Sequence, residues 1–138
     1  MQFCFISPEH PDYSHHIRRL GAAFDDAENP EKEYREMKEQ LAGGTLSLYH
    51  AKDSGVDLSI VGEADGQSYY VWGVAGVGFK AGIQELIRRI KLSGFKSVTC
   101  ATAKQGIRRM YRYFGRNAIT EVERLSNGKF CTWHKLEV

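Results

Sequence analysis

The spacing of apolar residues changes along this chain, and each change marks the border of an element. Residues 46–49 and 56–60 alternate apolar with polar side chains, which is the two-residue period of a half-buried strand. Residues 69–75 are apolar on both faces, so we expect a central strand that is covered on both sides. Shorter strand patterns occupy residues 2–7 and 98–100.

Helical spacing appears between these strands. Ser14 is the expected N-cap of the first helix, and Asn29-Pro30 opens the second, because Asn is a good cap and Pro fits the first helical position. The helices are predicted at residues 14–24, 30–42, 81–93 and 107–114. Two more strands, at 118–125 and 129–138, flank the hairpin turn Ser126-Asn127-Gly128. This order predicts one domain, residues 1–138, built as a mixed sheet with helices on its faces.

Charge is divided unevenly between the two halves. Residues 1–70 carry 6 Lys and Arg against 13 Asp and Glu, whereas residues 71–138 carry 13 against 4. A basic half indicates either an anionic ligand, such as a phosphorylated cofactor or nucleic acid, or simply a basic outer face. The arginines and lysines of the two late helices form the candidate nucleic-acid surface: Arg88, Arg89, Lys91, Lys104, Arg108, Arg109, Arg112 and Arg116.

Composition is that of a globular protein, with 42% apolar and 26% charged residues. No apolar run approaches the ~20 residues of a membrane helix, and the first residues lack the pattern of a signal peptide, so we expect a cytoplasmic protein without membrane contact. The odd set Cys4, Cys100 and Cys131 predicts buried reduced thiols. His10, His15 and His16 lack a companion cysteine or carboxylate at ligand spacing, so we expect a solvated helix start and no metal site.

A glycine-rich loop at residues 76–82 joins the central strand to the third helix. This strand–loop–helix order resembles the GNAT acetyltransferases, in which a Gln/Arg-x-x-Gly-x-Gly/Ala loop binds the pyrophosphate of acetyl-coenzyme A. Aligned from the helix, Val77 takes the Gln/Arg position, Lys80 the first glycine and Gly82 the last Gly/Ala, so one of three positions is kept. The small size and the C-terminal hairpin also resemble divergent GNAT-like proteins of tailed phages, which would place the protein in host cytoplasm or virion.

The resemblance implies an α/β (α+β) fold with a mixed, mostly antiparallel twisted sheet of about seven strands and about four helices. It implies that acetyl-coenzyme A (coenzyme A) lies between the fourth and fifth strands, with Gly73 marking a bulge that separates them. The implied cofactor-binding residues are Val74, Gly76, Val77, Gly78, Phe79, Lys80, Ala81 and Gly82.

The resemblance also extends to the catalytic groups. Met110-Tyr111-Arg112-Tyr113-Phe114-Gly115 fits the family's helix end, whose tyrosine protonates the departing thiolate, so Tyr111 is the implied general acid. A core tyrosine is the alternative, because Tyr111 shares a stripe with Ile107 and Phe114. Glu63 and Asp57 are the nearest candidate bases by sequence, and a hairpin surface charge is the alternative for each.

Three functions remain open. The first is an N-acetyltransferase that transfers an acetyl group from acetyl-coenzyme A to an unknown amine. The second is a non-catalytic GNAT-like phage structural or assembly protein, which the reduced loop motif favours. The third is a nucleic-acid-binding protein that uses the basic late helices.

Overall fold

The computed structural model describes residues 1–102 and 117–138 of the chain. Its strands are β1 (Gln2–Phe5), β2 (Ser47–Asp53), β3 (Val56–Asp65), β4 (Ser68–Val77), β5 (Ser97–Thr102), β6 (Asn117–Arg124) and β7 (Phe130–Glu137). Its helices are α1 (Tyr13–Leu20), the 3-10 helix η1 (Gly21–Phe24), α2 (Pro30–Ala42) and α3 (Phe79–Leu92). The helix predicted at 107–114 lies outside the described residues.

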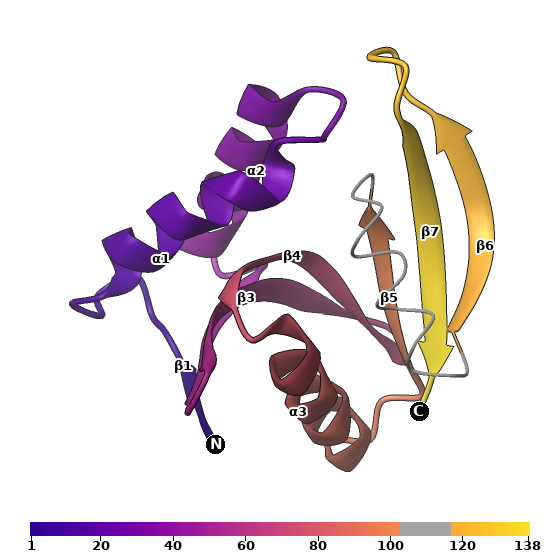
Figure 1. Ribbon diagram of the computed structural model, residues 1–138. Helices are drawn as coiled ribbons and strands as arrows, with labels where there is room; N and C mark the ends of the chain where they lie inside the picture. Colours follow the sequence, from indigo (N-terminus) through magenta and orange to yellow (C-terminus); the bar gives the residue numbers. More distant parts are fainter. Residues whose placement is uncertain (103–116) are drawn as a thin grey trace.

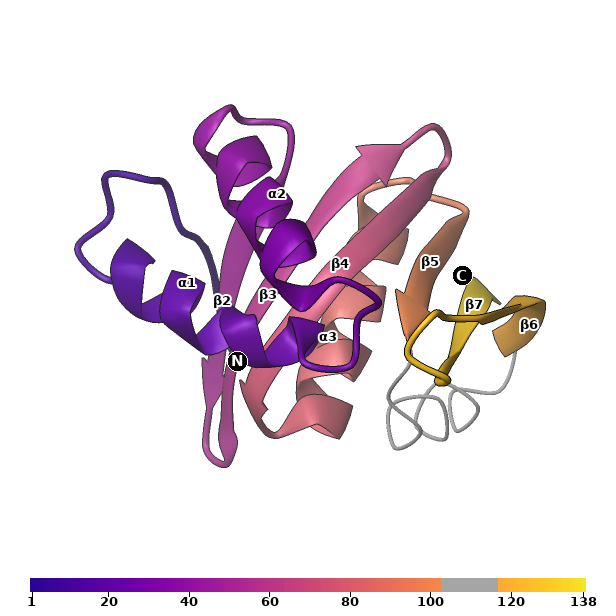
Figure 2. The ribbon, with the colours of Figure 1, turned by 90° about the horizontal axis from the view of Figure 1, so that it is seen from above.

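The seven strands form one sheet in the order β1-β2-β3-β4-β5-β7-β6. All neighbouring pairs are antiparallel except β4 and β5, which are parallel. The predicted mixed and mostly antiparallel sheet is therefore confirmed, and so is the interior position of the strand at 69–75. The helices α1 and α2 cover one face, and α3 covers the other (Figures 1 and 2).

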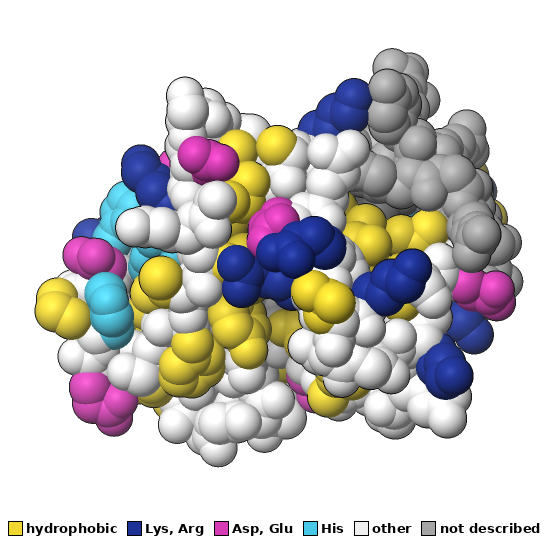
Figure 3. All heavy atoms as spheres, turned by 90° about the horizontal axis from the view of Figure 1, so that it is seen from below, with side chains coloured by type: hydrophobic (Ala, Val, Ile, Leu, Met, Phe, Trp, Pro, Cys, Tyr) yellow, Lys and Arg dark blue, Asp and Glu magenta, His cyan; other side chains and the backbone are white. Residues whose placement is uncertain are grey.

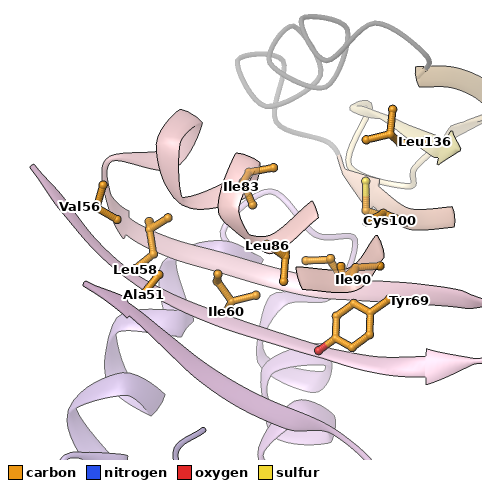
Figure 4. Packing of buried hydrophobic residues seen from close by; sticks show 12 residues of the cluster. Ala51, Val56, Leu58, Ile60, Tyr69, Ile83, Leu86, Ile90, Cys100 and Leu136 are labelled. Atoms are coloured by element: carbon orange, nitrogen blue, oxygen red, sulfur yellow. The ribbon is translucent and has the colours of Figure 1, made fainter. Parts of the chain in front are cut away.

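Each face of the sheet has its own apolar core. On one face, Ile83, Leu86 and Ile90 of α3 pack over Leu58 and Ile60 of β3 (Figure 4). On the other face, side chains of α1, η1 and α2 pack over the sheet around Leu48 and Val61: Leu20, Phe24, Met37 and Leu41. Cores on both faces explain why residues 69–75 of β4 are apolar on both sides.

The parallel pair β4–β5 is short. Pairing runs from Ser68 opposite Ser97 to Val71 opposite Cys100, and no described strand pairs with that edge of β4 beyond Val71. At the same point the register between β3 and β4 shifts, since Gly62 faces Val71 while Val61 faces Gly73. Trp72 is thus the extra residue of a bulge, directly before the Gly73 that was expected to mark it.

The second helix begins as its sequence predicts. The Asn29 side chain accepts a hydrogen bond from the Lys32 amide at 3.3 Å, and Glu33 Oε2 accepts one from the Asn29 amide at 3.1 Å. Two backbone amides at the start of α2 are thereby bound by side chains, as in a capping box, and Pro30 takes the first helical position.

Three details differ from the expectations. The helix α1 begins at Tyr13 with Asp12 at the N-cap position, so Ser14 lies inside it, and the segment after Leu20 is a 3-10 helix. His16 is buried rather than solvated, because it faces the sheet from α1. Cys4 is exposed on the edge strand β1, whereas Cys100 is buried as expected.

Candidate functional site

A cleft of about 630 Å³ opens on the face of the sheet that carries α1 and α2. Its floor is Tyr70 and Trp72 of β4, Ala101 of β5 and Trp133 of β7, so it lies over the place where β4 and β5 separate. The connection from η1 to α2 forms one wall, and the β6–β7 hairpin forms the other. The volume is within the range of about 300–1,000 Å³ that is typical of small-molecule sites.

The floor of the cleft is aromatic. The rings of Tyr70 and Trp133 are stacked with centroids 6.3 Å apart and an interplanar angle of 29°. Trp72 donates a hydrogen bond from Nε1 to Glu63 Oε1 at 3.1 Å. Glu63, the expected base, therefore lies beside the floor, opposite Tyr70 in the β3–β4 pair, and is not among the residues that line the cleft. Burial raises the pKa of Tyr70, and the thiols of Cys100 and Cys131 add to the rise.

The walls of the cleft are acidic, which the sequence analysis did not anticipate. Five carboxylates line it, with Lys32 as the lysine among the lining residues: Asp26, Glu28, Glu33, Glu36 and Glu123. Lys32 Nζ lies 3.9 Å from Glu36 Oε1. The excess of Asp and Glu in residues 1–70 was the available signal, because four of the five carboxylates come from that half.

The two walls touch across one end of the cleft. Lys129 of the β6–β7 turn forms an ion pair with Asp26. Next to it, Asn127 donates a hydrogen bond from Nδ2 to the carbonyl oxygen of Ala27 at 3.3 Å. These contacts join residues about a hundred positions apart in sequence and close the cleft at the hairpin.

The glycine loop lies at the end of β4, where α3 begins. Gly76 has φ 129° and Gly78 has φ 78°, a region that favours glycine. A Cβ at Gly76 would lie 2.1 Å from the Asp57 carbonyl oxygen, one at Gly78 would lie 2.3 Å from the Gly55 oxygen, and one at Gly82 would lie 2.2 Å from Leu58 Cδ1. The loop therefore needs its glycines to pack against β3 and the turn before it.

The remaining expected cofactor residues surround this loop. Phe79, Lys80 and Ala81 form the first turn of α3, before the first helical hydrogen bond from the Gly82 amide to the Gly78 oxygen. Lys80 and Ala81 are exposed, as are Gly76 and Val77, whereas Val74 is half-buried against the core on the α3 face. A helix start with its amides at the surface can accept a phosphate group.

The basic helix surface is only partly described. Tyr111, Arg108, Arg109 and Arg112 lie outside the described residues. Arg88 and Arg89 both contact Glu85, at 2.6 Å from Arg88 Nη2 and 2.9 Å from Arg89 Nε to Glu85 Oε1. The hydrogen bond from Arg88 lowers the pKa of Glu85 to about 2. Figure 3 shows Lys and Arg side chains gathered around an acidic group on this face.

No protein-family model and no curated protein matches the sequence. The structure, however, is similar to solved acetyltransferases. One is the ribosomal-protein-S18-alanine N-acetyltransferase of Escherichia coli, with a TM-score of 0.68 and 10% identity over 99% of this chain and 94% of that one.

The chain has a GNAT-like fold.

Two further solved structures align with this chain over almost the whole length of both proteins. The PaiA N-acetyltransferase of Thermoplasma acidophilum, solved in complex with coenzyme A, has a TM-score of 0.62 and 13% identity over 100% of each chain. The polyamine N-acetyltransferase of Drosophila melanogaster has a TM-score of 0.65 and 8% identity over 99% of this chain and 100% of that one. At these identities the similarity establishes the GNAT-like fold, while activity has to be argued from the cleft and the loop.

No helix in the described part of the chain combines the length and the apolar character that a membrane crossing requires.

Proposed function

We propose that this GNAT-like protein is an acyl-coenzyme A-dependent N-acetyltransferase whose acceptor amine occupies the acidic cleft. The observation that carries the proposal is the separation of β4 from β5 beyond Val71, directly under the cleft. An acyl group delivered along β4 from the glycine loop would meet the acceptor over Tyr70 and Trp72. One of the similar structures is described as forming N-acetylagmatine, so the fold supports acetyl transfer to an amine.

The start of α3 fits the phosphates of coenzyme A. The amides of Phe79, Lys80 and Ala81 precede the first helical hydrogen bond, and the helix macrodipole favours an anion there. Lys80 is exposed in this turn and adds a positive charge. When bound, the cofactor supplies the acetyl thioester, and this chain's residues would hold its phosphates and orient the thioester beside β4.

The chain's residues must also move protons. The acceptor amine attacks the acetyl carbonyl only as a free base, so a carboxylate has to accept its proton, and the departing thiolate takes a proton from an acid. Glu33 lines the cleft, and Glu63 lies beside the floor, where it accepts a hydrogen bond from Trp72 Nε1. We assign Glu63 or Glu33 as base, and Tyr111 as acid.

A non-catalytic GNAT-like assembly protein, including one of phage origin, is the alternative. It is favoured by the glycine loop, because Gly76, Gly78 and Gly82 are all explained by close packing against residues 55–58. Such a protein would keep the fold without binding coenzyme A. Arg88 and Arg89 are engaged by Glu85, so the described residues give the nucleic-acid hypothesis less support.

Isothermal titration with coenzyme A and acetyl-coenzyme A tests the proposal. We expect binding by the wild type and a loss of about 1–3 kcal/mol in Lys80→Glu, because a carboxylate would replace a charge-assisted contact with phosphate. Lys91→Glu is the matched control, since Lys91 is exposed on the last turn of the same helix. Equal affinities in both variants would remove Lys80 from the site.

A second outcome decides between enzyme and assembly protein. Wild-type protein that shows no binding at millimolar coenzyme A, while its melting curve reports a folded domain, would contradict the proposed function. The non-catalytic alternative would then stand.

A further inference from the structure

We infer that the acceptor is an aliphatic amine with at least two positive charges, such as a short polyamine. This inference rests on the proposed function and deepens it, since it names the substrate class of the same cleft. It is carried by three properties of the described cleft together: its charge, its aromatic floor and the spacing of its carboxylates.

The first property is an excess of negative charge inside a concave site. Five carboxylates line the cleft, against the ammonium groups of Lys32 in the lining and of Lys129 paired with Asp26, so three negative charges stay unbalanced among the described residues. A concave site with one sign of charge raises the local concentration of oppositely charged ligands. An anionic acceptor would be repelled by the same walls.

The second property is the floor. Tyr70, Trp72 and Trp133 present aromatic surface at the bottom of the cleft, and Tyr70 stacks on Trp133. Aromatic faces attract ammonium groups and also bury aliphatic chain. Carboxylates above an aromatic floor therefore match a molecule that alternates methylene segments with charged nitrogens.

The third property is the distribution of the carboxylates along the cleft. Glu33 and Glu36 are three residues apart on α2, which places them about 4.5 Å apart along the helix axis. Glu123 stands on the opposite wall, in β6. A single ammonium group can satisfy one of these positions, whereas a polyamine can reach carboxylates on both walls while one terminal amine lies over Trp72.

Titration calorimetry with spermidine and with propylamine tests this assignment, with and without saturating coenzyme A. We expect spermidine to bind at least about tenfold more tightly than propylamine, because each further charge-assisted contact adds roughly that factor. In the variant Glu33→Gln/Glu36→Gln the spermidine affinity should fall about tenfold or more, and in Glu123→Gln about threefold to tenfold. The matched control is Glu39→Gln, since Glu39 is exposed on α2 and does not line the cleft.

The outcomes separate this inference from the proposed function. Coenzyme A that binds while spermidine does not, or spermidine and propylamine that bind equally, would overturn the polyamine assignment and leave the acetyltransferase proposal intact. If spermidine binds the folded protein but coenzyme A does not, the proposed acetyltransferase activity is contradicted, while the assignment of the cleft as a cation-binding site stands. Because Glu33 also caps α2, the double variant must first be shown to fold. If the folded double variant and Glu123→Gln both keep the wild-type affinity for spermidine, the carboxylates of the two walls do not bind it.

Discussion

At the scale of single residues, the described molecule holds a polar network between α1 and the strands β2 and β3, on the same face of the sheet as the cleft. Arg19 donates from Nε to Ser59 Oγ at 2.9 Å, and that oxygen lies 2.6 Å from His16 Nδ1. Asp57 accepts from His50 Nε2 at 2.8 Å and pairs with Arg19 Nη1 at 2.9 Å. Because Ser59 accepts from Arg19, its own proton can be donated to a neutral His16.

This network predicts that acid weakens the fold. Burial, together with the nearby charges of His50 and Arg19, lowers the pKa of His16 from 6.5 to about 4. Between pH 6.5 and pH 4, His16 is protonated in the unfolded chain and neutral in the folded chain. The stability that neutral His16 contributes is therefore fully present above about pH 6.5 and is lost as the pH falls toward 4. Melting temperatures measured from pH 7 to pH 4.5 should decrease accordingly.

Asp57 acts in the same direction at lower pH. Burial raises its pKa, but hydrogen bonds from His50, Lys52 and Arg19 outweigh burial and hold the pKa well below 3.8. Its contribution is therefore lost only as the pH falls below that value. His16→Gln should flatten the slope between pH 6.5 and 4.5, whereas the exposed control His15→Gln should keep it; a slope that survives in His16→Gln would contradict this account.

At the scale of elements, the glycine loop joins the end of β4 to β3 and the turn before it. Gly78 has positive φ, and its missing Cβ makes room for the Gly55 carbonyl oxygen and for Val56. Gly44, at the end of α2, has a similar φ of 82° but nothing within 4 Å of an added Cβ. Comparing Gly44→Ala with Gly78→Ala therefore separates the cost of backbone strain, which both share, from the cost of overpacking, which arises only at Gly78.

We predict that Gly44→Ala lowers the free energy of unfolding by about 1 kcal/mol, from strain alone. Gly78→Ala should cost about 1–3 kcal/mol more, because the added methyl group meets rigid backbone rather than a flexible side chain. Urea denaturation at a fixed pH measures both. Equal losses in the two variants would show that the loop can move away from residues 55–56.

The elements themselves were readable from the sequence because their signals are local. Asn29-Pro30 and the glycines at 76–82 mark helix starts, and the period of two marks β2 and β3. The bulge at Trp72 was less accessible, because one extra residue shifts the register while the apolar pattern on both faces hides the shift. The expectation of a solvated His16 was wrong for a similar reason, since its buried position involves a contact with Ser59, 43 residues away in sequence.

At the scale of the whole molecule, the cleft is built from segments that meet only after folding. Its lining comes from residues 23–36 and 123–133, together with the middle of the sheet. No spacing rule within one segment predicts that Asp26 meets Lys129, so the acidic walls escaped the sequence analysis although the acidic half was evident. The expected base Glu63 lies beside the cleft floor, bonded to Trp72, but is not part of the lining.

The ion pair between the two walls also reduces the negative charge of the cleft. Lys129 neutralises Asp26, so Lys129→Gln should expose one more carboxylate to a cationic ligand and tighten spermidine binding by ~2- to 5-fold. The exposed control Lys135→Gln should leave the affinity unchanged. Calorimetry at low salt gives the comparison, and weaker binding by Lys129→Gln would mean that the ion pair holds the walls in place.

The short pairing of β4 with β5 has a consequence for aggregation and for recognition. A strand with unpaired amides and carbonyls is a template for another chain, and most proteins protect such an edge at the border of a sheet. Here the stretch of β4 beyond Val71, which no described strand pairs on its β5 side, lies inside the sheet, with β3 on its other side. A foreign strand would have to part the sheet to reach it, whereas a slender extended molecule with amide groups of its own can enter and complete the hydrogen bonding that the described strands leave open.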